Sequence, residues 1–91
     1  MKAHTIRDRI NARSSLAQLK EPAFRLIDTL QGFNPDLQVE TLSLTLATLC
    51  RSAGIDPHEM ITRSNRQLLE ADTVRNPHLE AIAAYAAGEF Q

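Results

Sequence analysis

The sequence has little of what marks several large classes of protein. Its 91 residues include one cysteine, three glycines and no tryptophan, and 4% of them are aromatic. Cys50 cannot form a disulfide within the chain, which excludes a disulfide-stapled secreted domain. No leader of basic, apolar and small residues opens the chain, so we expect a cytoplasmic protein.

Long apolar runs are also missing. The longest are a few residues, far below the roughly 20 that cross a bilayer, so we expect no membrane partner. The chain is 43% hydrophobic and 23% charged, which is ordinary for a globular protein, and its length suits one small domain over residues 1–91. We therefore expect one folded core.

The net charge of -1 conceals an asymmetry. Residues 1–25 hold six Lys or Arg and two acidic residues, a net charge of +4, whereas the remaining residues hold four basic and nine acidic ones, a net charge of -5. The basic segment predicts a helix or arm over residues 1–14 that is weakly anchored, because Ile6 and Ile10 are its main apolar residues.

Three Asn/Asp-Pro pairs mark predicted helix starts, at Pro35, Pro57 and Pro77. Asn or Asp can cap the free amides of a first turn, and proline at the first helical position loses no hydrogen bond. Gly32 and Gly54 stand where a left-handed residue commonly ends a helix. The sequence therefore predicts helices that alternate with short turns.

Apolar residues recur at helical spacing over residues 15–31 and 35–53, and the turn between these segments is short. We predict an all-α bundle of four or five short helices built around an antiparallel hairpin of these two segments. Pro22 either kinks the first helix or starts a new one. The predicted core is Leu19, Phe24, Leu26, Ile27, Leu30, Val39, Leu42, Leu46, Leu49, Ile55, Ile61, Leu68, Leu79 and Ile82.

The segment 35–53 carries a second apolar stripe. Leu37 and Leu44 fall opposite the series that runs from Val39 to Ala53. Alternation of Leu42, Leu44 and Leu46 with polar residues would also suit a strand, but the helical pattern covers the whole segment and both of its ends. A helix with two apolar stripes is either central in its domain or shares one stripe with another chain.

Residues that carry chemistry are sparse. His4, His58 and His78 lack paired ligand spacing, and Thr62 stands where a second zinc ligand would follow His58-Glu59. Cys50 is expected in the core rather than in a reactive site. We predict no enzyme, metal, cofactor or small-molecule substrate.

Residues 49–66 have the loose spacing of a helix-turn-helix, with a small residue at Cys50, a turn glycine at Gly54 and an apolar residue at Met60. That alternative predicts DNA binding, although Asp56 and Glu59 add negative charge at the leading end of the second helix. Its candidate contacts are Arg51, Arg63, Ser64, Asn65 and Arg66.

The favoured hypothesis is a small adaptor or regulatory protein that binds another protein, with a second copy of the chain among the candidate partners. It draws on the second stripe of the segment 35–53 and on the opposed charges of the two chain regions. The predicted interface residues are Leu37, Leu44, Arg7, Arg9 and Arg13.

Overall fold

The structure is a computed structural model and describes residues 3–13 and 15–89. Over these residues it has five helices and no strand, which confirms the all-α prediction. The helices are α1 (Ala3–Ala12), α2 (Ala17–Leu30), α3 (Pro35–Ala53), α4 (Pro57–Thr73) and α5 (Pro77–Glu89). Of the basic segment, Lys2 lies outside the described residues.

The proline, glycine and capping residues of the sequence determine where the helices begin and end. α3, α4 and α5 begin at Pro35, Pro57 and Pro77, as predicted. The Asp56 side chain accepts a hydrogen bond from the His58 amide at 2.9 Å, which caps α4. The two turn glycines, Gly32 and Gly54, both have positive φ, at 95° and 71°.

Proline 22 lies inside α2, which continues through it without restarting. A proline there leaves one carbonyl of the preceding turn without its helical donor. The segment Val39 to Leu46 is helical throughout, so its strand-like alternation is a feature of composition alone.

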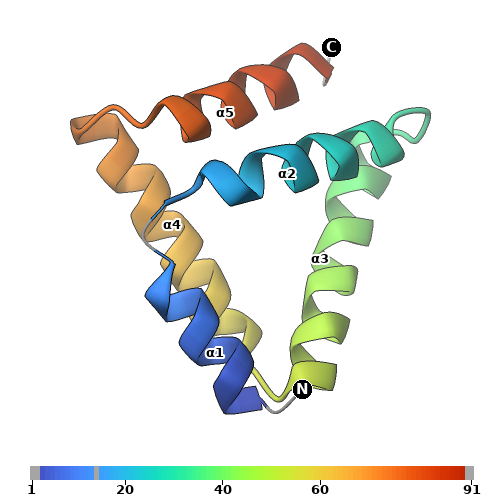
Figure 1. Ribbon diagram of the computed structural model, residues 1–91. Coiled ribbons are helices and arrows are strands. Elements are labelled where there is room, and N and C mark those ends of the chain that lie inside the picture. Colours follow the sequence, from blue (N-terminus) through green and yellow to red (C-terminus); the bar gives the residue numbers. More distant parts are fainter. Residues whose placement is uncertain (1–2, 14, 90–91) are drawn as a thin grey trace.

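Three helices form the edges of a triangle in Figure 1. α3 and α4 meet at the turn that contains Gly54, α2 crosses between their other ends, α5 lies along α2, and α1 lies along α4. The antiparallel hairpin of α2 and α3 is not confirmed, because the two helices diverge from the turn at Gly32 (Figure 1). α2 packs mainly against α5 instead.

The contact between α2 and α5 includes an aromatic pair. The rings of Phe24 and Tyr85 have centroids 4.6 Å apart. The Tyr85 hydroxyl donates a hydrogen bond to a carboxylate oxygen of Asp28, one turn further along α2. An aromatic contact and a polar contact therefore hold α5 on α2.

The predicted core is wrong in large part. Ile55 is buried, as is Cys50, which confirms the expectation for the cysteine. The half-buried members are Phe24, Ile27, Leu30, Leu46, Leu79 and Ile82, and the exposed ones are Leu19, Leu26, Val39, Leu42, Leu49, Ile61 and Leu68. For the exposed members on α2 and α3 the physical reason is the divergence of these two helices, which leaves their facing apolar stripes uncovered by this chain.

Among the helices of the described ranges, none combines the length and hydropathy needed to cross a bilayer.

Candidate interaction surface

The middle of α3 exposes apolar side chains toward two sides. One row, here called the inner stripe, consists of Val39, Leu42, Leu46 and Leu49. Val39, Leu42 and Leu49 are 59%, 43% and 64% exposed, and Leu46 is half-buried. Val39 and Leu42 lie on successive turns and Leu49 lies two turns further along, so the row is exposed on three of its four turns. Contiguous exposed apolar side chains are typical of binding surfaces.

The inner stripe continues into an apolar hollow between three helices. The hollow has a volume of about 310 Å³. Gln38 is its one polar lining residue, and its side-chain amide is directed to the Phe33 carbonyl at 2.8 Å. The other lining residues are Ala23, Leu26, Ile27, Leu30, Val39, Leu42, Ile82 and Ala86. With these walls the hollow can accept aliphatic or aromatic groups, and it has no charged group to bind an ion.

The outer stripe consists of Leu37 and Leu44, the pair predicted as an interface. These side chains are 47% and 69% exposed. By helical geometry Glu40 and Arg51 lie on the same side of α3, so the outer stripe is interrupted by charge.

The inner half of α3, which bears the inner stripe, carries no charged residue. At 100° per residue, the three charged residues of α3, which are Asp36, Glu40 and Arg51, all fall on the outer half of the helix. The inner half carries apolar, hydroxyl, thiol and amide side chains alone. Depletion of charge with enrichment of apolar groups is typical of the centre of a protein–protein interface.

Of the three arginines predicted at the interface, Arg7 and Arg9 lie on α1 and Arg13 directly follows that helix. α1 is apart from the middle of α3 (Figure 1). Arg7 pairs with Glu59 of α4 at 3.5 Å, and the Arg13 guanidinium donates to the Gln18 side chain at 3.2 Å. Arg9 is exposed. The structure therefore does not bring these arginines and the outer stripe into one continuous surface.

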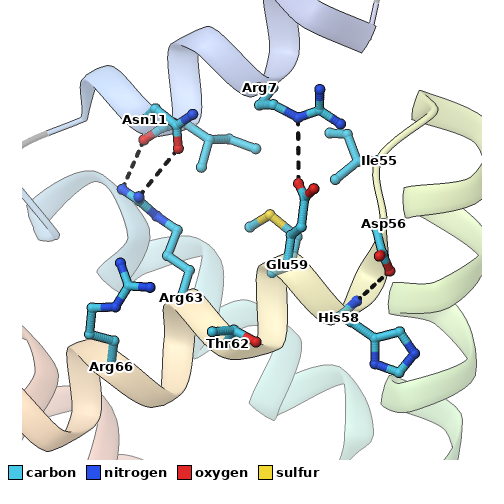
Figure 2. Close-up of a pocket in the computed structure, with 11 residues that line it drawn as sticks. Arg7, Asn11, Ile55, Asp56, His58, Glu59, Thr62, Arg63 and Arg66 are labelled. Atoms are coloured by element: carbon cyan, nitrogen blue, oxygen red, sulfur yellow. Dashed lines mark hydrogen bonds and ion pairs between the residues drawn. The ribbon is translucent and has the colours of Figure 1, made fainter.

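A second hollow, of about 400 Å³, lies between α1 and α4, and Figure 2 shows its polar contacts. The Arg63 guanidinium donates to the Ile10 carbonyl at 3.0 Å and lies 3.5 Å from the Asn11 side-chain oxygen. The Ile10 carbonyl also accepts a hydrogen bond from the Arg13 amide at 3.2 Å. Because the C-terminal end of a helix is the negative end of its dipole, a cation there stabilises α1. Arg63 and the Arg7–Glu59 pair thus hold α1 parallel to α4 (Figure 2).

The residues of the DNA-binding alternative separate into two groups. Arg51, Ser64, Asn65 and Arg66 are exposed, whereas Arg63 is half-buried and bound to α1. The spacing of residues 49–66 carries no signal for this role of Arg63, because its acceptors lie more than 50 positions away in the sequence.

Over residues 3–13 and 15–89, no group of three or more His, Cys, Asp or Glu side chains could hold a metal ion. Cys50 is a buried free thiol, and His58 and its counterpart on α5, His78, lie on different helices.

Comparison with protein-family models, with curated proteins and with solved structures finds no match to the chain.

Proposed function

We propose that the chain is a non-enzymatic adaptor or regulatory protein that acts by binding another protein through α3. The observation that carries the proposal is the inner stripe, which exposes Val39, Leu42 and Leu49 beside an apolar hollow. The outer stripe is a second, smaller candidate surface on the same helix. A cytoplasmic location belongs to the proposal as well, since the one cysteine is a free thiol.

The size of the required interface follows from the exposed area. Full burial of a Val or Leu side chain contributes about 1.5–3 kcal/mol, so covering the exposed half of Val39, Leu42 and Leu49 would contribute about 1 kcal/mol each. Association itself costs about 4–15 kcal/mol. A partner must therefore cover the apolar hollow together with the stripe.

A DNA-binding regulator remains the alternative. It is favoured by the left-handed turn at Gly54 between α3 and α4 and by the exposure of Arg51, Asn65 and Arg66. It is weakened by Arg63, which holds α1 on α4 instead of extending into solvent.

Affinity capture from native lysate, with and without nuclease, tests the proposal. The bait is the full chain, compared with the Leu42→Glu and Leu44→Glu variants and with a Ser43→Glu control. Ser43 is exposed and lies between the two stripes, so all three substitutions place the same charge on one helix. Circular dichroism establishes that each variant is helical.

We expect nuclease-resistant protein partners that are lost with Leu42→Glu and kept with Ser43→Glu. Loss with Leu44→Glu instead would assign binding to the outer stripe. Identical recovery with every variant, or recovery that nuclease abolishes, would reject protein binding through α3.

A further inference from the structure

The chain exposes more surface than its mass requires. Its accessible surface is 6968 Å², whereas a folded monomer of 10.1 kDa is expected to expose about 5,300 Å². Its radius of gyration is 13.9 Å, against about 12 Å expected for this length. The excess of about 1,700 Å² is surface that a monomer of ordinary shape would bury.

The excess is matched by apolar groups that usually form a core. Twelve large hydrophobic residues are exposed among the described residues. They include Leu26 on α2, Leu68 on α4 and three members of the inner stripe, which are Val39, Leu42 and Leu49. The molecule is also thin, with extents of 38, 31 and 19 Å. A thin plate has no room for these side chains beneath its own surface, so their cover must come from outside the chain.

The excess accessible surface is similar in area to the interface that a second copy of the chain would bury. Obligate homodimers bury about 2,000–5,000 Å² in total, or about 1,000–2,500 Å² per chain, and the excess of about 1,700 Å² lies within that range. Two plates 19 Å thick that stack on their broad faces also give a particle of nearly equal dimensions.

The chemistry of the inner half of α3 agrees with self-association. In a two-fold interface each side chain near the axis meets its own copy, so a charge there would face a like charge. The inner half has none, because Asp36, Glu40 and Arg51 all lie on the outer half. A net charge of -1 per chain adds little repulsion between copies.

We propose that two copies of this chain form a two-fold dimer in which the inner stripe and the apolar hollow of each are covered by the other. This inference rests on the proposed function, since it names an occupant for the same surface. It goes beyond that function by identifying the occupant as a second copy of the chain, related to the first by a two-fold axis.

Molar mass in solution tests the dimer. Light scattering after size exclusion, and sedimentation over a dilution series, should give about 20 kDa for the full chain, which is twice its 10.1 kDa mass. Leu42→Glu should halve the molar mass or unfold the chain, whereas Leu44→Glu, with the same charge on the opposite side of α3, should leave the dimer intact. Because Leu42→Glu can fail to fold, the wild-type thermal midpoint is also measured against concentration, and it should rise with concentration.

A wild-type mass near 10 kDa with a midpoint independent of concentration would overturn the dimer. So would a dimer that Leu44→Glu dissociates and Leu42→Glu does not. The two proposals fail separately: a monomer whose captured partners disappear with Leu42→Glu keeps the proposed function and loses the dimer. A dimer that Leu42→Glu dissociates, with the same proteins captured by both Leu42→Glu and Leu44→Glu, keeps the dimer and loses the proposed function.

Discussion

The single tyrosine of the chain, Tyr85, is a direct probe of how α5 sits on α2. Its hydroxyl donates to the Asp28 carboxylate, and its ring lies against Phe24 with centroids 4.6 Å apart. The hydrogen bond to Asp28 is the main cause that raises the pKa of Tyr85 to about 12, with smaller contributions from partial burial and from the charges of Asp28 and Glu89. An unperturbed tyrosine has a pKa of about 10.

The expected shift is therefore about two pH units, and it can be measured without interference. The chain has one tyrosine and no tryptophan, so the ultraviolet absorbance of tyrosinate reports Tyr85 alone. We expect a midpoint of about 12 in the folded protein and of about 10 in urea. Asp28→Ala should lower the folded midpoint toward about 10, while Glu89→Gln should change it little because the charge of Glu89 makes the smallest contribution to the shift.

The direction of the pH dependence follows from the same shift. The folded state holds the Tyr85 proton more tightly than the unfolded state, so the contribution of this contact is fully present below pH 10. It is lost as the pH rises through about 12. Circular dichroism over the same range shows whether α5 remains folded while the tyrosine titrates. A folded midpoint near 10, unchanged by Asp28→Ala, would refute the contact between α2 and α5.

Two further predictions concern α1 and the DNA-binding alternative. Arg63→Met keeps an extended side chain and removes the donors to the Ile10 carbonyl. The amides of α1 should then exchange with solvent about fivefold faster, which is equivalent to about 1 kcal/mol. Arg66→Met, at an exposed residue one turn away, should leave the exchange unchanged. Equal exchange in both variants would mean that Arg63 does not anchor α1. In a gel-shift assay at low salt we expect no DNA to be retarded; retardation that weakens with salt and with Arg66→Ala would favour the DNA-binding reading of residues 49–66 instead.

The helix boundaries could be predicted from the sequence because they depend on local chemistry. Pro35, Pro57 and Pro77 each begin a helix, since proline suits the first helical position, and Gly54 ends α3 in a left-handed conformation. These effects act within one turn of the chain. They can therefore be predicted without knowing which distant residues pack against the helix.

The arrangement of the helices could not be predicted in the same way. A short turn at Gly32 is compatible both with an antiparallel hairpin and with two diverging helices, and the choice depends on long-range contacts. Here Tyr85 binds Asp28 from 57 positions away, so α5 takes the place on α2 that the hairpin assigned to α3. Periodicity locates an apolar stripe, but it does not identify the surface that covers it.

The same limit applies to the candidate site. The sequence indicates the second stripe of Leu37 and Leu44 because α3 needs one core-facing stripe and these residues are in excess of it. It predicts Val39, Leu42 and Leu49 in the core. In the structure both stripes are exposed, and the stripe that resembles a core is the larger and the less charged of the two.

In the proposed dimer, a stripe with the composition of a core and the exposure of a surface would link the stability of this chain to its association. The residues that would normally fill a monomer's interior contribute their full apolar transfer energy when a partner covers them. Because a small domain has little apolar surface to spare, the folded state should gain a large share of its stability on association. Leu42→Glu should then lower both the stability of the fold and the affinity of association. Leu44→Glu, which adds a charge on the side of Glu40 and Arg51, should lower both of them less. The difference between these two variants therefore measures how far folding and association are coupled.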